Sequence, residues 1–268
     1  MDAPSPDMHS PIEQALQAGK HIDLFCDYDG VLSAIAPRPQ DACLDKNTKD
    51  ILTQLAQRDA LHVSIVSGRA LADIRSRMGI PGITYVGNHG LEMEGADIQY
   101  RYSVPERMLD ALRSLAAELR RTLQEYSGVI VEEKQPGVTV HFRQVSQEHV
   151  PLILERLSAL VQPHANANLV RVTSGKEVRE VRPAVDWDKG KAVQWLLRER
   201  HGADWHKKSF PVFLGDDETD EDAFRLLRDQ GVTIRVGQAS PEGTAAHFTL
   251  QDLAEVHMFL EWLLHSLP

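Results

Sequence analysis

Two aspartates separated by one residue follow an apolar run near the start of the chain. Asp27-Tyr28-Asp29-Gly30 comes directly after residues 22–26, whose composition is that of a buried strand. In an extended chain, side chains two residues apart point to the same side, so both carboxylates reach the same space. The glycine allows a sharp turn behind them. Two carboxylates are therefore delivered together to the mouth of a site, although an exposed loop pair would have the same spacing.

A second acidic cluster follows another apolar run. Residues 212–215 read as a buried strand, and six of the seven residues from Asp216 to Asp222 are acidic. A helix N-terminus favours one or two carboxylates, but not this many. If both strands end at one edge of a sheet, their carboxylates crowd together and need a cation. Because all the donors are oxygens, the cation they favour is a hard one such as Mg²⁺.

Two further segments suit a phosphate group. Ser67-Gly68-Arg69 follows a strand-like run and opens a helix, so a hydroxyl and backbone N–H groups can cradle an anion there. Lys189 also lies at the start of a helix, where its amino group is a mobile point charge. Taken alone, each segment is more typical of an ordinary helix start than of a phosphate site.

Rival catalytic motifs are missing from the sequence. It contains no glycine-rich dinucleotide or P-loop pattern, no G-x-S-x-G elbow, no H-E-x-x-H helix and no calcium-loop spacing. Its two cysteines, Cys26 and Cys43, are too few for a disulfide framework or a cysteine zinc site. The acidic motifs therefore carry the predicted chemistry.

The elements that must position these motifs alternate between strand and helix. Apolar runs predict strands at 22–26, 63–66, 83–86, 212–214 and 232–236. Helical patterns fall at 47–57, 70–78, 191–200, 220–229 and 253–264. This alternation predicts an α/β fold with a parallel sheet covered on both faces. Open parallel sheets bind ligands beyond the carboxyl ends of their strands, where the motifs lie.

A different pattern interrupts this alternation between residues 102 and 182. Helices are predicted at 106–125 and 147–161, and strands at 128–133, 138–142, 169–172 and 177–181. The turn signal at 135–137 joins the first two strands and favours an antiparallel or mixed sheet. We therefore expect a core of residues 1–101 and 183–268 that carries an inserted α/β domain, 102–182.

Composition and charge restrict the partners. The 268 residues are 42% hydrophobic and 25% charged, as in soluble globular proteins, and the formal net charge is −10. That charge argues against binding to nucleic acid or anionic membranes. No apolar run approaches the ~20 residues of a membrane span, and residues 1–17 show no signal-peptide pattern, so we expect a cytoplasmic protein.

Taken together, the four motifs resemble those of the haloacid dehalogenase superfamily of phosphohydrolases. They are Asp27 to Gly30, Ser67, Lys189, and Gly215-Asp216-Asp217 with Asp220, in that order along the chain. The resemblance implies a Rossmann-like parallel-sheet hydrolase core with an inserted α/β cap domain that selects the substrate.

Within that superfamily the chain is similar to the trehalose-6-phosphate phosphatases. The similarity lies in the segment Gly87-Asn88-His89-Gly90 and in three spaced pairs: Glu132 with Lys134, His141 with Arg143, and Lys176 with Glu180. Carboxylates and amines on strands suit a polyhydroxylated sugar, although a solvent-exposed face would show the same alternation. One departure is Val31, where the family usually has threonine.

The resemblance implies a role for each matching residue. Asp27 is the nucleophile that forms an aspartyl-phosphate, and Asp29 is the general acid–base group. Ser67 and Lys189 hold the phosphate oxygens. The cofactor is Mg²⁺, bound by Asp27, Asp216 and the backbone carbonyl of Asp29. The substrate-binding residues are Asp27, Tyr28, Asp29, Ser67, Gly68, Arg69, Asn88, His89, Glu132, Lys134, His141, Arg143, Lys176 and Glu180.

Other functions remain open at this stage. We expect a monomer that acts on a small-molecule sugar phosphate, with no nucleic-acid or membrane partner. A phosphatase for another sugar phosphate, such as sucrose-6-phosphate, would share the core. A phosphoryl-transferring mutase would retain the aspartyl-phosphate, and a non-catalytic sugar-phosphate sensor would typically lack one of the motif carboxylates.

Overall fold

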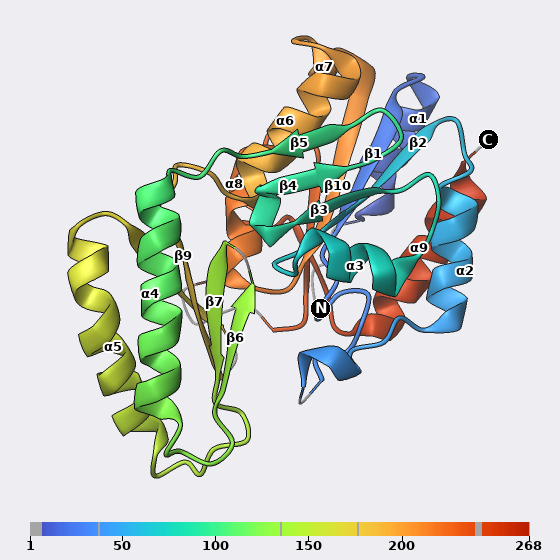
Figure 1. Cartoon of the computed structure of the whole chain (residues 1–268). Coiled ribbons are helices and arrows are strands. Elements are labelled where there is room, and N and C mark those ends of the chain that lie inside the picture. Colours follow the sequence, from blue (N-terminus) through green and yellow to red (C-terminus); the bar gives the residue numbers. More distant parts are fainter. Residues whose placement is uncertain (1–6, 37, 135, 176, 239–242, 268) are drawn as a thin grey trace. The chain divides into compact units, whose positions relative to one another are not determined.

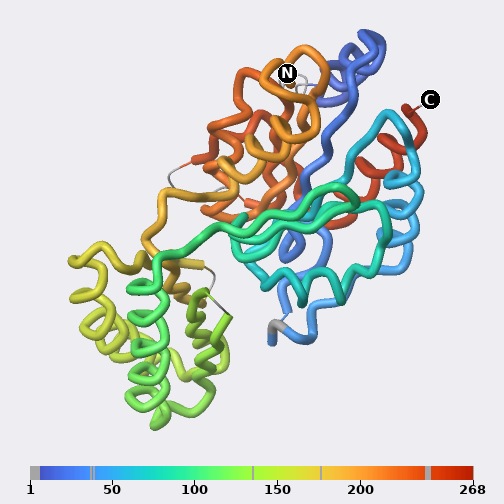
Figure 2. The backbone as a smooth tube through the Cα atoms, turned by 45° about the horizontal axis from the view of Figure 1, so that its top comes forward, coloured from blue at the N-terminus to red at the C-terminus, as the bar shows by residue number. Residues whose placement is uncertain are grey.

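The chain forms two compact units. The computed structural model describes residues 7–36, 38–134, 136–175, 177–238 and 243–267 (Figure 1). The first unit comprises residues 1–101 and 187–268, and the second comprises 102–186. The chain therefore leaves the first unit after Arg101 and returns to it at Trp187 (Figure 2). The boundary predicted at residue 182 lies inside a strand of the second unit.

An eight-stranded sheet forms the centre of the first unit. Its spatial order is β12-β11-β10-β1-β2-β3-β4-β5, and the six strands from β12 to β3 are parallel. The strands are β1 (His21–Cys26), β2 (Leu61–Val66), β3 (Thr84–Gly87), β4 (Glu92–Glu94), β5 (Gln99–Arg101), β10 (Ser209–Gly215), β11 (Val232–Val236) and β12 (Phe248–Leu250). The predicted α/β class with a parallel sheet is confirmed.

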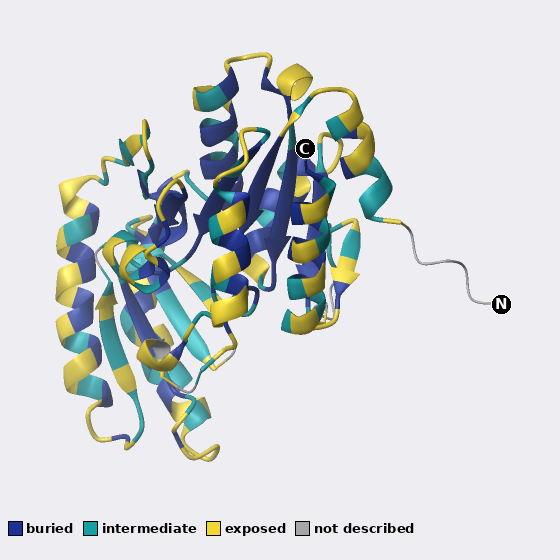
Figure 3. Cartoon of the chain, turned by 90° about the vertical axis from the view of Figure 1, so that its right-hand side faces the viewer, coloured by how far each residue is buried: buried dark blue, intermediate teal, exposed yellow. Residues whose placement is uncertain are grey.

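Helices cover both faces of this sheet, because successive side chains of each strand alternate between two apolar layers. Leu24 and Cys26 of β1 belong to one layer and Phe25 to the other. The central strands are buried along their length (Figure 3). The first layer packs against α1 (His9–Gln17), α2 (Lys46–Leu55), α3 (Leu71–Met78) and α9 (Leu253–Ser266). The second packs against α6 (Lys189–His201), α7 (Trp205–Lys208) and α8 (Glu221–Leu227).

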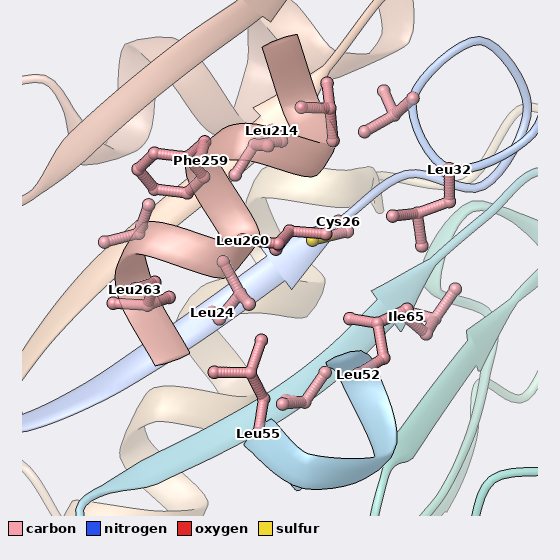
Figure 4. Close-up of a cluster of buried hydrophobic side chains, with 14 of the residues drawn as sticks. Leu24, Cys26, Leu32, Leu52, Leu55, Ile65, Leu214, Phe259, Leu260 and Leu263 are labelled. Carbon is pink, nitrogen blue, oxygen red and sulfur yellow. The ribbon is translucent and has the colours of Figure 1, made fainter. Parts of the chain in front are cut away.

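The layer under α2 and α9 shows how the core is filled. Leu24 and Cys26 lie between Leu52 and Leu55 of α2 and the apolar side of α9, which Figure 4 shows at close range. Cys26 is fully buried and unpaired, and burial raises the pKa of its thiol far above the ordinary value. Cys26 is therefore a small packing residue.

The second unit is an antiparallel sheet with two helices on one face. Its strand order is β6-β7-β9-β8. The elements are α4 (Glu106–Leu123), β6 (Ile130–Lys134), β7 (Gly137–His141), α5 (Val150–Asn166), β8 (Val170–Gly175) and β9 (Val178–Pro183). Val138, Val140 and Val181 point toward α4 and α5 and form one core with them. The alternate residues of β7 and β9 consequently belong to the opposite face of the sheet.

Several short elements escape prediction from sequence. The strands β4, β5 and β12 are three residues each, and β4 and β5 carry charged residues at exposed or half-buried positions. Strands of three residues are too short to show the alternation over about four to eight residues on which prediction depends. Among the described residues, no helix is long and apolar enough to span a bilayer.

A buried ionic network joins α6 to the sheet at the end away from the acidic motifs. The Asp23 carboxylate, fully buried on β1, accepts hydrogen bonds from Arg200 Nη1 and His201 Nε2, both at 2.7 Å. Burial works to raise the pKa of Asp23, but His201 and Arg200 outweigh it and lower that pKa. Arg200 Nη2 also donates to Ser64 on β2 and to Thr84 on β3, each at 2.8 Å. One arginine therefore bonds to three strands.

We predict that Arg200→Met lowers the free energy of unfolding by about 3–5 kcal/mol, because it leaves a buried carboxylate without its arginine partner. Urea unfolding followed by tryptophan fluorescence measures the loss. Arg198→Met is the matched control, since Arg198 lies exposed on the same helix. Equal losses in the two variants would contradict a role for the buried network.

Candidate active site

Strand register brings the two acidic motifs together. The strands β1 and β10 are parallel neighbours, and Cys26 pairs with Leu214. Asp27 continues this pairing, since its N–H donates to the Leu214 carbonyl at 2.9 Å. Asp27 and Asp216 consequently emerge from the same edge of the sheet, as the sequence predicts for parallel strands.

A buried lysine bridges the two motifs. Lys189 Nζ donates to Asp27 Oδ2 at 2.6 Å and to Asp220 Oδ1 at 2.7 Å, and Lys189 is only 1% exposed. Lys189 is the first residue of α6, whose N-cap Asp188 accepts a hydrogen bond from the N–H of Lys191. Burial works to lower the pKa of Lys189, but Asp220 and Asp27 outweigh it and raise that pKa well above its ordinary value. The ammonium group is therefore charged.

The charges of Asp216 and Asp217 also act on this bridge. Burial raises the pKa of Asp27 to about 7, and the charges of Asp217 and Asp216 add to the increase. Burial likewise raises the pKa of Asp220 well above its ordinary value. Burial also works to raise the pKa of Asp217, but Lys189 and the bonds from Thr219 outweigh it and lower that pKa to about 2. The raised pKa values of Asp27 and Asp220 mean that their charged forms are disfavoured in this buried cluster, even beside Lys189.

Glycines allow the carboxylates to approach the backbone this closely. Gly30 has φ +84°, and a Cβ there would lie 2.1 Å from Asp216 Oδ2. A Cβ on Gly215 would lie 2.3 Å from the carboxyl carbon of Asp220. Any side chain at either position would displace a carboxylate of the cluster, so close packing requires glycine at both positions, and the positive φ favours it at Gly30 as well.

The donor set fits a divalent metal ion. Oxygen atoms of Asp27, Asp216 and Asp220 lie within 4.8 Å of one another, and all three residues are buried. Hard cations such as Mg²⁺ prefer carboxylate oxygens of this kind. Because the charged forms of Asp27 and Asp220 are disfavoured here, a cation that stabilises them is favourable at this position. Asp220 already accepts three hydrogen bonds, from Lys189 and from the N–H groups of Asp216 and Asp217, whereas Asp27 accepts two, so Asp220 has less capacity left for a metal than Asp27.

Arg69 holds Asp29 in a bidentate ion pair. Arg69 Nε and Nη2 donate to the two Asp29 oxygens at 2.7 and 2.6 Å, and Nη1 donates to Asp73 at 2.9 Å. The guanidinium carbon lies 5.3 Å from the centre of the Tyr28 ring. Tyr28 itself is fully buried, and its hydroxyl donates to the Ala42 carbonyl. In this arrangement Arg69 and the Tyr28 side chain support Asp29.

The second motif packs against the Gly-Asn-His-Gly segment. Ser67 is fully buried, and its Oγ accepts a hydrogen bond from the Arg69 N–H at 3.1 Å. The His89 ring lies on Gly68, where a Cβ would be 2.6 Å from it. Asn88 and His89 both have positive φ, of 50° and 55°. Their N–H groups donate to the carbonyls of Arg69 and Ser67, so the two segments form one unit.

The polar residues predicted to bind sugar occupy one face of the second unit's sheet. Cross-strand pairing places Glu132, Thr139 and Glu180 in a row over β6, β7 and β9. His141 lies on the same side, and its Nε2 is 2.9 Å from Glu132 Oε2, while Lys134 Nζ is 3.5 Å from that oxygen. Burial works to raise the pKa of Glu132, but His141 and Lys134 outweigh it and lower that pKa.

Arg143, another predicted residue of this unit, stands apart from the row. It follows β7, and its Nε lies 3.3 Å from Glu177 Oε2. Lys176 lies outside the described residues. In the first unit, Val31 is fully buried in the core, so the departure from threonine occurs at a packing position.

Arg235, a buried arginine, was not predicted from the sequence. It lies near the acidic loop, residues 216–220, which follows β10. Arg235 on β11 is 6% exposed and donates to the main-chain oxygens of Asp216 and Asp217. The available signal is a charged residue in the otherwise uncharged strand Val232–Val236. Buried arginines are rare unless their donors are satisfied, so this position suggests a specific partner.

The chain is similar in sequence to curated trehalose-phosphate phosphatases. The trehalose-phosphate phosphatase of Mycobacterium tuberculosis is 39% identical over 250 residues, which cover 91% of this chain and 61% of that protein. The chain therefore spans about three fifths of the length of the curated relatives it matches.

Solved structures show the same fold. The C-terminal domain of C. albicans trehalose-6-phosphate phosphatase has a TM-score of 0.83 at 24% identity, covering 99% of each chain. Aspergillus fumigatus trehalose-6-phosphate phosphatase has a TM-score of 0.65 at 28% identity, covering 99% of this chain and 100% of that one. These matches confirm the predicted haloacid-dehalogenase-type fold.

The model of the trehalose-phosphatase family matches residues 25–254, and this chain belongs to that family.

Proposed function

We propose that this chain hydrolyses trehalose 6-phosphate to trehalose and phosphate in a Mg²⁺-dependent reaction. The observation that carries the proposal is the Asp27–Lys189–Asp220 cluster, in which a buried ammonium group bridges two carboxylate motifs. The substrate is proposed from the family match and from relatives named trehalose-phosphate phosphatase.

Asp27 is the proposed nucleophile. Its Oδ1 accepts the Tyr28 N–H at 2.6 Å, and Oδ2 accepts from Lys189, so both oxygens have fixed positions. In the first step a carboxylate oxygen attacks phosphorus and the bond from phosphorus to the sugar oxygen breaks. The resulting aspartyl-phosphate divides the hydrolysis into two easier steps.

Asp29 is the proposed proton donor and acceptor. It protonates the departing sugar oxygen, then takes a proton from the water that attacks the aspartyl-phosphate and regenerates Asp27. A carboxylate that is bonded at both oxygens to Arg69 does not donate a proton, so the pair must open during the cycle. Asp73 remains as the partner of Arg69 when it does.

The remaining groups of this unit stabilise charge. Ser67 Oγ accepts one hydrogen bond from Arg69 and keeps its own proton for a phosphate oxygen. Lys189 supplies a fixed positive charge beside Asp27. When bound by Asp27, Asp216 and the backbone carbonyl of Asp29, Mg²⁺ would neutralise negative charge on the phosphoryl oxygens.

The polar row on the second unit's sheet is the proposed recognition surface for the sugar. Glu132 and Glu180 lie on either side of Thr139, whose hydroxyl is buried. Carboxylates held on rigid strands accept hydrogen bonds from sugar hydroxyls at low entropic cost. Arg143 and Lys176 are proposed from the family motif as further sugar-binding residues.

The proposal includes a monomer that acts in the cytoplasm. Cys43 is exposed and unpaired, and Cys26 is buried and unpaired, as expected in a compartment that keeps thiols reduced. Light scattering of the purified chain tests the monomer.

The function is tested by phosphate release from trehalose 6-phosphate with and without Mg²⁺. We expect release only when Mg²⁺ is present, and none from the Asp27→Asn variant, because an amide is a poor nucleophile. Asp29→Asn should reduce turnover by about 10²–10⁴-fold. A much better rate on sucrose 6-phosphate would overturn the substrate assignment, and a turning-over Asp27→Asn variant would overturn the nucleophile.

Asp27→Asn should also change how the stability of the metal-free chain depends on pH. Burial raises the folded-state pKa of Asp27 from 3.8 to about 7, so its contribution to stability is complete below pH 3.8 and is lost as the pH rises through 7. The uncharged amide does not titrate, although the variant leaves Lys189 with Asp220 as its charged hydrogen-bond partner. In EDTA the melting temperature of the variant should therefore rise relative to that of wild type between about pH 5 and about pH 8.

Mg²⁺ should raise the melting temperature of wild type but not of Asp27→Asn, because the variant loses a ligand. Asp50→Asn, which removes an exposed carboxylate from α2, is the control and should behave as wild type. A variant difference that does not change with pH would contradict the raised pKa.

The sugar-binding face is tested by two neighbouring residues of β6. Glu132→Gln should lower kcat/KM for trehalose 6-phosphate by about 10- to 100-fold, because it removes a charged hydrogen-bond acceptor. Turnover of p-nitrophenyl phosphate, which has no sugar, should be unchanged. Glu133→Gln is the control, since Glu133 pairs with Arg120 on α4 at 2.8 Å. Equal effects of both variants on trehalose 6-phosphate would contradict this recognition surface.

A further inference from the structure

Arg235 binds backbone carbonyls of the acidic loop. It lies on β11 and pairs in register with Gly215, the last residue of β10. Its Nη2 donates to the Asp216 carbonyl at 2.6 Å and its Nη1 to the Asp217 carbonyl at 3.2 Å. Both bonds go to main-chain oxygens, so the guanidinium acts on the course of the loop.

Asp220 binds the backbone N–H groups of the same loop. Asp220 Oδ2 accepts the N–H groups of Asp216 and Asp217 at 3.0 and 3.1 Å. The N–H groups of these two residues are therefore bonded to a carboxylate and their carbonyls to a guanidinium. This leaves the backbone of Asp216 little freedom to rotate.

Glu221 anchors Arg235 in turn. Glu221 Oε1 accepts from Arg235 Nη1 at 3.1 Å and from Thr244 Oγ1 at 2.7 Å, and Oε2 accepts from the Ala245 N–H at 2.8 Å. Arg235 and Glu221 are 6% and 7% exposed. The pair links the start of α8 to the segment before β12, so the guanidinium cannot move without disturbing both.

The Asp216 carboxylate has little room to move. Its Oδ2 occupies the space that a Cβ on Gly30 would fill, at 2.1 Å. A small rotation of the Asp216 backbone would therefore move the carboxylate away from Asp27, with which it shares the candidate metal site. Residues that orient a metal ligand through hydrogen bonds typically contribute 10- to 100-fold to metal affinity.

We propose that Arg235 is a positioning residue for Mg²⁺: by fixing the Asp216 and Asp217 carbonyls, it directs the Asp216 carboxylate toward Asp27 and sets the affinity of the site. This inference rests on the proposed function, in which Mg²⁺ is the cofactor. Arg235 contacts neither the metal nor the substrate in this assignment.

Calorimetric titration of the substrate-free chain with Mg²⁺ tests the inference. Arg235→Lys keeps a buried cation beside Glu221, but one ammonium group does not reproduce the fork that binds two carbonyls. We expect the variant to bind Mg²⁺ about 10- to 100-fold more weakly than wild type. In turnover, the Mg²⁺ concentration for half-maximal rate should rise, while the rate at saturating Mg²⁺ recovers. A purely structural role would instead lower stability without this Mg²⁺ dependence.

Two further variants complete the design. Arg225→Lys is the matched control, because Arg225 is exposed on α8 and pairs with Asp222 at 3.1 Å. It should bind Mg²⁺ as wild type does. Arg235→Met combined with Glu221→Gln removes both charges and so avoids an unpaired buried carboxylate if Arg235→Lys fails to fold.

The outcomes separate the inference from the function. Wild-type Mg²⁺ affinity in either folded Arg235 variant would overturn the positioning role and leave the proposed phosphatase intact. Failure of the wild-type chain to bind Mg²⁺ would overturn the proposed cofactor, and the positioning role with it.

Discussion

The ammonium group of Lys189, buried between Asp27 and Asp220, is the contact on which the rest of the first unit depends. It joins the end of β1, the start of α6 and the turn after β10 at distances of 2.6 and 2.7 Å. A buried charge of this kind is tolerated only when its partners are held in place. The close approaches at Gly30 and Gly215 follow from that requirement, because the carboxylates crowd against the backbone.

The same helix is tied to the same strand at its other end. Lys189 opens α6 and bonds to Asp27 beyond β1, while Arg200 and His201 close α6 and bond to Asp23 within β1. Two ionic contacts separated along both elements fix how far α6 can slide over the sheet. Apolar packing between them tolerates small shifts, whereas charge-assisted hydrogen bonds do not. The distance from the Lys189 nitrogen to Asp27 is therefore set by both ends of the helix.

Sequence patterns predicted the parts of this arrangement that repeat along the chain. Apolar runs located β1, β2, β10 and β11, and the parallel arrangement of such strands brings Asp27 and Asp216 to one edge. The partners of individual side chains have no such pattern. The pair between Asp29 and Arg69 joins residues 40 positions apart, and two of the bonds of Arg235 go to main-chain oxygens, which every residue has. Only the folded backbone determines which of these groups meet.

The ion pair between Asp29 and Arg69 has a further consequence for the charge of the site. Burial raises the pKa of Asp27 to about 7, and the charges of Asp217 and Asp216 add to the increase, so further negative charge at this edge is unfavourable. An unpaired Asp29 would add such a charge. Arg69 balances the charge of Asp29, and Asp73 and the Tyr28 ring keep the guanidinium in place. The ion pair therefore limits the negative charge beside Asp27 and Asp216, the carboxylates proposed to bind the metal.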